Sequence, residues 1–479
     1  MPQRREGPVE TSWPLGLFCH LSHSPRLLMS VLTKRIALLC AMAGAMAALA
    51  GCASYERVPL NKQVSLAAHT SDLEGANGKR VTLTTLDRLV VINNPDLRAA
   101  RAKLGVAAAQ VMQAGILPNP AVAISYPFVI AGPGVLQNVK SILLLGTKRE
   151  GAQNAASEIS ATLLWQEWQM IGKARLLAVD IISGEREKRL IVQTRKFLEE
   201  RFNLTDAAVK EGNATLATLS PDLAAVGDIQ RAYDDLERLQ LSRRHQLNAL
   251  LGLVPGAELT LVAPTDVPSI DPAMIRRQLA ALADRRPDLI ALQYGYQSED
   301  AKVREAILSQ FPNLSVGVNS TGTGETATAL TFGPQLTIDL PVFDRNQGAI
   351  AVEETTREQL YQEFNARLST AVGEINALLS EQALLSRQLS GVEPRLKEAR
   401  MIAQMAEMAF KQGTFDERAY VEIEVALLAR EQEKAGLQQA ILEGQVGLAT
   451  LIGANMPRAA IEPEAPLANP LGTFREAAR

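Results

Sequence analysis

The stretch from Leu336 to Gly348 changes its hydrophobic pattern halfway. Apolar residues first alternate with polar ones, which is the period-2 pattern of a strand with one apolar face. From Asp344 to about Phe410 the pattern instead predicts a single helix of about 66 residues, roughly 100 Å long at 1.5 Å per residue. Its apolar residues recur at alternating steps of three and four, as in a coiled-coil seam, with a break at Gln382. The seam positions are Ile375, Leu378, Leu385, Leu389, Val392, Leu396, Ala399, Ala403, Ala406 and Phe410.

The chain contains an internal repeat. Five landmarks recur in the same order about 200 residues apart, which indicates a duplicated helix–strand–strand–helix–helix unit. The pairs are Asn94-Pro95-Asp96-Leu97 with Arg286-Pro287-Asp288-Leu289, Pro118-Asn119 with Pro312-Asn313, Gly146–Arg149 with Phe343–Asn346, Lys210–Gly212 with Lys411–Gly413, and Leu250–Gly252 with Leu451–Gly453.

The repeat divides the chain into five parts. We expect an N-terminal extension and signal peptide at 1–51, an extended arm at 52–85, the first repeat at 86–270, the second repeat at 271–455 and a tail at 456–479. Within the first repeat, residues 135–145 read as a strand, with a long helix opening at Gly146. Ser220, Pro221 and Asp222 predict a helix start, with Ser220 as N-cap and proline in the first turn.

Two repeats give four predicted strands per chain, and three of them, 121–130, 314–321 and 330–342, alternate in polarity. In 314–321, Leu314, Val316 and Val318 oppose Ser315, Gly317 and Asn319, and 329–342 follows the same rule. An apolar face opposite a polar face suits a lipid-facing barrel around water. Four strands cannot close, and an open edge in lipid leaves backbone groups unpaired, so three chains would supply twelve strands. The alternative is a soluble hairpin packed on helices, which leaves its place at the ends of such long helices unexplained.

The N-terminus predicts export. Lys34-Arg35 precedes an apolar run that ends in Leu49-Ala50-Gly51-Cys52. This ending resembles the lipobox of bacterial lipoproteins, in which the cysteine is acylated and becomes the first mature residue. Met29 is then the expected start, with 1–28 as an upstream extension. A plain signal peptide with an incidental cysteine is the alternative.

Composition narrows the class of protein. The 479 residues are 47% hydrophobic but only 4% aromatic, which favours Ala- and Leu-rich helices. A formal charge of −3 argues against nucleic acid as a partner. After residue 52 the sequence has no apolar run long enough for a membrane helix.

The sequence offers no catalytic constellation. His69 and His245 lie in polar stretches, and no phosphate-binding glycine loop follows a strand. We therefore expect no enzyme activity, no cofactor and no metal site. Met401, Met405 and Met408 form a helical stripe whose thioethers would suit soft ions such as Cu(I), but packing between helices is the simpler interpretation. Pro394 predicts a kink in the long helix.

Several of these motifs together resemble the TolC-type outer membrane efflux family. They are the lipobox, Phe311-Pro312-Asn313-Leu314 before a strand, Leu340–Gly348 at the strand–helix junction, and Phe410–Thr414 at the helical turn. The resemblance covers nearly all of residues 70–455. It implies a mainly α chain that contributes strands to a trimeric twelve-stranded barrel above a long α-helical periplasmic tube. The junction residues are Pro341, Phe343, Asp344, Arg345 and Gly348, and their form is similar to members that serve heavy-metal pumps.

The resemblance also implies a role. The chain would be the outer membrane channel of a tripartite efflux system, lipid-anchored at Cys52 and reaching into the periplasm. Its partners would be two further copies, outer membrane lipid, a periplasmic adaptor and an inner-membrane pump, for which the RND type is one candidate. Gly212 and Gly413 would form the periplasmic tips, and the gate would use acidic residues after Gly413. The candidates are Asp416, Glu417, Glu422 and Glu424. The substrate stays open between metal ions, drugs and protein, and a pore-less coiled-coil lipoprotein is the alternative function.

Overall fold

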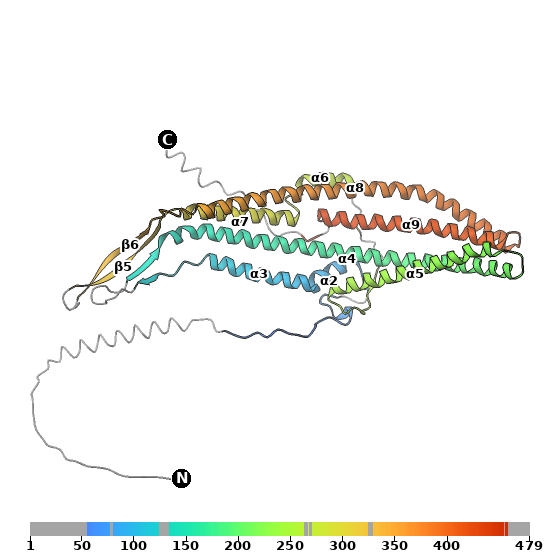
Figure 1. Ribbon diagram of the computed structural model, residues 1–479, viewed down its shortest axis with the longest axis horizontal. Helices are drawn as coiled ribbons and strands as arrows, with labels where there is room; N and C mark the ends of the chain where they lie inside the picture. The colour runs from blue at the N-terminus through green and yellow to red at the C-terminus, as the bar shows by residue number, and fades with distance from the viewer. Residues whose placement is uncertain are drawn as a thin grey trace, which may run out of the picture. The chain divides into compact units, whose positions relative to one another are not determined.

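The computed structural model describes residues 55–76, 80–123, 134–262, 267, 271–323, 329–454 and 456–457. The chain divides into two compact units, Met1–Ser65 and Leu66–Arg479. Residues 55–65 of the first unit contain no helix or strand, and their side chains are exposed. The predicted lipobox and Cys52 lie outside the described residues. All the helices and strands labelled in Figure 1 belong to the second unit.

The elements of the second unit follow the predicted repeat. The first half contains η1 (Thr70–Asp72), β1 (Arg80–Val81), α2 (Leu83–Asn93), α3 (Pro95–Ala114), β2 (Ala121–Ala123), β3 (Gly134–Asn138), α4 (Val139–Lys210), α5 (Leu216–Leu251) and β4 (Thr260–Leu261). The second half contains α6 (Pro272–Gln278), η2 (Leu279–Ala281), α7 (Pro287–Ser309), β5 (Asn313–Thr323), β6 (Ala329–Asp339), α8 (Gln347–Lys411) and α9 (Glu417–Ile452). The duplication is confirmed: α3 and α7 both begin at the predicted prolines, and α5 and α9 both end before a left-handed glycine, Gly252 or Gly453.

Local capping sets the helix starts. Asn94 ends α2, and its side-chain oxygen accepts a hydrogen bond from the amide of Leu97 at 3.0 Å, which opens α3. Proline follows at the first position of α3, where no amide donor is needed. The break and restart expected at this motif are therefore confirmed.

Two predicted boundaries in the first repeat are wrong. The strand at 135–145 ends already at Asn138, whose side chain accepts from the amide of Ser141 at 3.0 Å and starts α4. The apolar run that follows continues as helix, because a short apolar run suits a strand or a buried helix equally. The start predicted at Ser220 is wrong as well, since α5 begins at Leu216 and Pro221 lies inside it.

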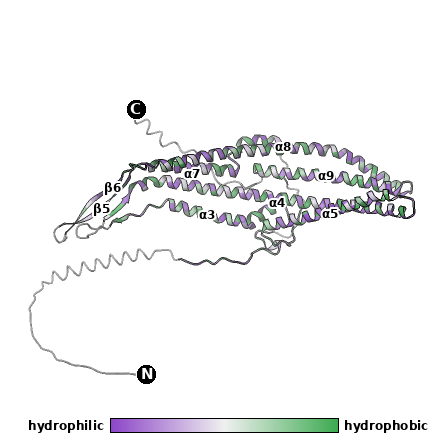
Figure 2. Ribbon diagram, in the orientation of Figure 1, coloured by the Kyte–Doolittle hydropathy of each residue, from purple (hydrophilic) through white to green (hydrophobic). Residues whose placement is uncertain are grey.

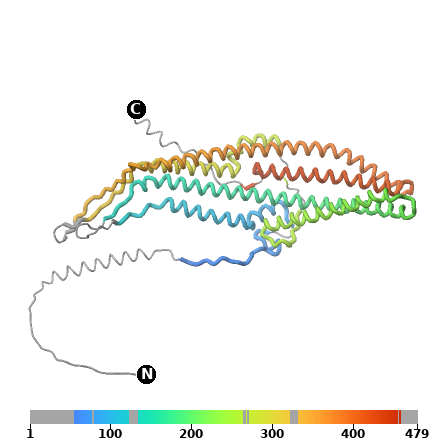
Figure 3. The backbone as a smooth tube through the Cα atoms, viewed as in Figure 1, coloured from blue at the N-terminus to red at the C-terminus, as the bar shows by residue number. Residues whose placement is uncertain are grey.

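Helix α4 is the centre of the packing. It contacts α2, α3, α5, α7 and α9, while α8 packs on α7 and α9. The hairpins α4–α5 and α8–α9 turn at one end of the second unit, and the strands lie at the other end (Figure 3). One core joins α2, α4 and α5, and a second joins α8, α9 and the residues around α6 and α7. Polar and apolar residues alternate along every long helix (Figure 2), as expected for helices with a narrow apolar seam.

The coiled-coil seam of α8 is confirmed. All ten predicted positions are buried or half-buried. Gln382, the predicted break, donates a hydrogen bond from Nε2 to the backbone carbonyl of Ile441 on α9 at 3.2 Å. It fits because Gly444 faces it, and a Cβ there would overlap the amide of Gln382. The first repeat uses the same device, in which Gln240 of α5 lies over Gly184 of α4.

The four predicted strands form one antiparallel sheet in the order β2-β3-β5-β6. The hairpin of the first repeat joins that of the second through β3 and β5. Strands β2 and β6 therefore lie at the edges, each with one neighbour among the described residues.

The two faces of this sheet differ in polarity as predicted. Val316 pairs with Leu336, and Val135 pairs with Val318, so these side chains share one face. On this face Leu314 is half-buried, while the exposed fractions of Val316 and Phe332 are 42% and 71%. The opposite face carries a polar row, in which Asn138 donates to Asn313 at 2.5 Å and Asn313 donates to Asp339 at 3.1 Å. Among the described helices, none is long and apolar enough to cross a membrane.

Candidate functional site

The helical hairpins end in two equivalent turns. Gly212 has φ 80° and Gly413 has φ 72°, which are left-handed values that an L side chain rarely adopts. The amides of Asn213 and Thr414 each donate to a carbonyl in the last helical turn, Ala208 at 2.7 Å and Ala409 at 3.0 Å. The turns expected at both glycines are therefore present. The two turns share one geometry, with the same left-handed glycine and the same hydrogen bond back to the last helical turn.

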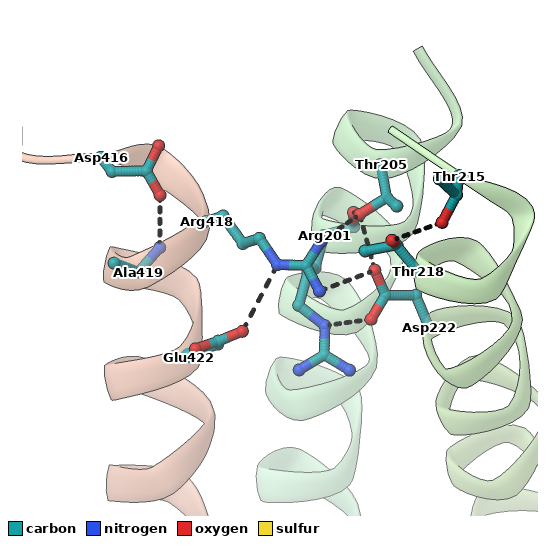
Figure 4. Close-up of polar contacts among 9 residues, drawn as sticks. All are labelled: Arg201, Thr205, Thr215, Thr218, Asp222, Asp416, Arg418, Ala419 and Glu422. Carbon is teal, nitrogen blue, oxygen red and sulfur yellow. Dashed lines mark hydrogen bonds and ion pairs between the residues drawn. The ribbon is translucent and has the colours of Figure 1, made fainter. Parts of the chain in front are cut away.

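A buried carboxylate lies near these tips, in the second turn of α5. Asp222 on α5 is only 2% exposed and contacts Arg201 Nε on α4 at 2.9 Å. Thr205 donates its hydroxyl to the same carboxylate at 2.6 Å. These contacts join the two helices of the first hairpin (Figure 4).

Arg418 connects this carboxylate to the second repeat. Its Nη2 lies 3.6 Å from Asp222 Oδ2, and its Nη1 donates to Thr205 at 3.0 Å. Figure 4 shows its guanidinium reaching from α9 toward α4 and α5. We use the name tip clamp for the four residues Asp222, Arg201, Thr205 and Arg418. The sequence did not single out Arg201, Thr205 or Arg418, and it gave Asp222 only a place at a helix start.

Aromatic side chains join the hairpins at the same level. Tyr420 of α9 stacks on Phe410 of α8, with ring centroids 4.9 Å apart. Phe197 of α4 meets Tyr420 edge-on at 6.3 Å. Both tips are thus held together by an apolar contact beside the polar clamp.

The four candidate acidic residues have separate surroundings. Asp416 is the N-cap of α9 and accepts from the amide of Ala419 at 2.9 Å. Glu417 is exposed in the first turn. Glu422 accepts from Arg418 Nε at 3.4 Å, so it touches the tip clamp.

Glu424 differs from the other three. Burial raises the pKa of its carboxyl, and the nearby charges of Glu407 and Glu431 raise it further. Its ionised form is therefore disfavoured where α9 packs on α8. Among the four, Glu422 is the one with a described contact to the tip clamp, and Glu424 is the one whose pKa is shifted by its surroundings.

The strand–helix junction is held by local hydrogen bonds. Asp344 accepts from the amide of Asn346 at 2.8 Å, and Gln347 accepts from the amide of Arg345 at 2.8 Å. Asn346 has φ 60° and donates from its side chain to the carbonyl of Ala306 at 2.8 Å. Asn346 was absent from the predicted junction residues, although its left-handed conformation makes the turn into α8.

The other predicted junction residues have lesser roles. Phe343 is 94% exposed, and a Cβ at Gly348 would meet nothing within 4 Å. Pro341 is half-buried just past the end of β6. These positions do not converge on a shared site.

The described residues contain no group of three or more His, Cys, Asp or Glu side chains placed to hold a metal ion. The methionine stripe, in contrast, is not packed within the chain: the exposed fractions of Met401, Met405 and Met408 are 56%, 51% and 57%. The simpler interpretation of this stripe, packing between helices, does not hold within one copy of the chain.

Comparison with known proteins agrees with this geometry. Residues 279–454 match the family described as outer membrane efflux protein. The chain is 24% identical over 259 residues to the pyoverdine export outer membrane protein OpmQ of Pseudomonas putida, covering 53% of this chain and 55% of OpmQ. It is 21% identical over 279 residues to the cation efflux system protein CusC of Escherichia coli K12, covering 54% of this chain and 59% of CusC. These matches therefore span about half the length of the relatives.

Solved structures extend the likeness of fold. The outer-membrane channel OprN superposes with a TM-score of 0.63 at 17% identity, covering 84% of this chain and 99% of that one. A crystal structure of CusC gives a TM-score of 0.61 at 15% identity, covering 84% and 99%. The resemblance to TolC-type outer membrane efflux proteins is confirmed, and the second repeat carries the matched family segment. The family and fold neighbours are channels and not enzymes, which agrees with the expected lack of catalysis.

Proposed function

We propose that three copies of this chain form the outer membrane channel of a tripartite efflux system. The observation that carries the proposal is the sheet, which has one exposed apolar face, one polar face and two edges. An apolar outer face toward lipid and a polar inner face toward water are what a membrane barrel requires. The long helices that follow the strands would then extend the passage into the periplasm.

The need for more than one copy follows from the edges of the sheet. Unpaired backbone groups at β2 and β6 would each cost several kcal/mol in hydrocarbon. Pairing β2 of one copy with β6 of the next satisfies both edges, and three copies would give twelve strands. A closed ring also suits the long helices, which would pack side by side below the barrel.

The mass of the purified protein in detergent tests this assembly. Light scattering corrected for bound detergent should give three chains per particle. A stable, folded monomer would contradict the barrel and leave a pore-less lipoprotein scaffold as the function. The same preparation tests the anchor: intact mass should show acylation at Cys52, and Cys52→Ala should lose the lipid but keep the trimer.

The tip clamp supports a gate at the periplasmic end. Arg418 ties α9 to α4 and α5, so the ends of both hairpins are held at one separation. Opening would require the second hairpin to move away from the first and the clamp to break. Glu422 lies beside this clamp, and threefold symmetry would repeat it as an acidic ring that attracts cations.

The relatives support a proposal for the partners and the substrate. CusC is named as a cation efflux protein and OpmQ as a pyoverdine export protein, and both support export toward the outside. A periplasmic adaptor would bind at the turns of Gly212 and Gly413. An inner-membrane pump would supply the energy for export. Heavy-metal ions are one candidate cargo.

Growth of a deletion strain tests the cargo. If the deletion strain becomes sensitive to copper, silver, cobalt or zinc salts, and expression of the protein from a plasmid restores growth, that result would assign metal export. Sensitivity confined to organic compounds would assign drug or siderophore export, and unchanged growth under every stress would contradict an efflux role.

A further inference from the structure

The methionine stripe of α8 lies on the side of the helix that faces away from its own chain. Ala403 and Ala406 are buried in the seam with α9. Met401, Met405 and Met408 each lie two residues from one of these alanines, about 200° around the helix at 3.6 residues per turn. Their exposed fractions all exceed half, whereas methionine is ordinarily among the most buried residue types.

The spacing of the three residues brings their thioethers together. Positions i, i+4 and i+7 lie on one stripe, with about 6 Å and 4.5 Å of helical rise between neighbours. A methionine side chain has three rotatable bonds, so the outer two sulfur atoms can turn toward the middle one. No backbone movement is needed for all three to face one point above Met405.

Two of the positive charges beside the stripe are paired with carboxylates. Arg400 donates to Glu431 on α9 at 2.9 Å, and Lys411 donates to Glu407 at 2.7 Å. Beside the exposed side chains of Lys397 and Glu398, one turn earlier, the stripe offers soft, uncharged sulfur atoms as ligands. Such donors select soft monovalent ions and bind divalent ions such as Zn²⁺ or Mg²⁺ poorly.

We infer that Met401, Met405 and Met408 form a surface binding site for a soft monovalent metal ion, Cu(I) or Ag(I), near the periplasmic end of α8. The site uses only this chain's own side chains and requires that no neighbouring copy covers the stripe in the assembled protein. Three neutral thioethers leave the charge of the bound ion uncompensated, so binding should be reversible and independent of pH between 5 and 8, where thioethers do not titrate.

Equilibrium dialysis of the purified full-length protein against silver nitrate in chloride-free buffer tests the site. Elemental analysis should find about one Ag(I) per chain more in the wild type than in a Met401→Leu, Met405→Leu, Met408→Leu variant. The matched control replaces Met112 and Met274, which are 72% and 50% exposed but lie apart on α3 and α6. This control should keep the full silver content, and zinc nitrate should give no difference between any of the proteins.

Comparison of the variants decides the outcome. Equal silver binding by the wild type and the triple variant overturns the site, as does an equal loss in the control. If a neighbouring copy covers the stripe in the assembled protein, silver cannot enter, and the same equality appears. Should the triple variant fail to fold, Met405→Leu alone must show measurably weaker silver binding than the wild type, because it removes the central ligand.

Discussion

Arg418 of the second repeat lies 3.6 Å from the buried carboxylate of Asp222 in the first repeat. The two residues are 196 positions apart in the sequence and are brought together only by the packing of the hairpins, α4–α5 against α8–α9. Asp222 keeps a second cation, Arg201, within its own hairpin. Removing Arg418 therefore breaks the link between repeats without leaving the carboxylate unpaired.

The first prediction concerns this link. Arg418→Ala should lower the free energy of unfolding by only about 1 kcal/mol, because the arginine is partly exposed and Arg201 remains. It should nevertheless open the tip, so that cells become permeable to a large antibiotic such as vancomycin. Arg430→Ala is the matched control, since the ion pair that Arg430 makes among the described residues lies within α9, with Glu433 at 2.8 Å. Unchanged antibiotic sensitivity with Arg418→Ala would show that the clamp is not a gate.

The second prediction concerns the tip turns. Gly413→Val should strain a left-handed position by about 1–2 kcal/mol and distort the surface proposed to meet the adaptor. Efflux should fall in a resistance assay while the trimer still assembles. Gly436→Val serves as control, since this glycine has ordinary helical φ and open space around its Cβ position. Full resistance with Gly413→Val would show that this turn does not take part in adaptor binding.

The third prediction concerns the glutamine–glycine contacts between paired helices. Gly444→Ala should push Gln382 out of its place and break its hydrogen bond to Ile441, which costs about 1–3 kcal/mol. The melting temperature should drop. Gly373→Ala, at an open position of α8, should instead stabilise the helix by about 1 kcal/mol. If Gly444→Ala melts at the same temperature as Gly373→Ala or higher, the contact between Gln382 and Gly444 does not stabilise the fold.

The sequence predicted the fold where structure depends on local pattern. The α8 seam, the turns at Gly212 and Gly413 and the alternation of Val316 with polar neighbours all follow from periodicity or from glycine's access to positive φ. The tip clamp could not be predicted in this way, because it depends on which faces of distant helices meet. The one available signal was the acidic residue that follows Pro221, and the pattern predicted only a helix start there.

The methionine stripe shows the same limit. Helical spacing placed Met401, Met405 and Met408 on one face, which the structure confirms. Spacing placed Ala403 in the seam with α9, as the structure confirms, but it does not tell whether another helix covers the opposite face of α8. Packing between helices was the simpler interpretation of the methionines on that face, and the structure exposes them.

The fourth prediction concerns pH. Because the pKa of Glu424 is raised above its ordinary value of 4.5, the folded tip binds a proton more tightly than the unfolded chain does. Its repulsion with Glu407 and Glu431 is present at neutral pH and disappears as the pH falls through the raised pKa. Acid should therefore stabilise the closed tip and lower the open probability of the channel.

A substitution assigns this effect to one residue. Glu424→Gln should make the open probability independent of pH in the mildly acid range, whereas Glu417→Gln, in the exposed first turn of α9, should leave the pH dependence intact. An unchanged pH response in Glu424→Gln would place the acid sensitivity elsewhere.

Single-channel recording in planar lipid bilayers tests the central claim most directly. The purified full-length oligomer should insert and give discrete conductance steps, with selectivity for cations that decreases in Glu422→Gln. Arg418→Ala should give longer open times at the same pH. If the folded oligomer gives no conductance steps in the wild type and in Arg418→Ala alike, the chain does not form a membrane channel.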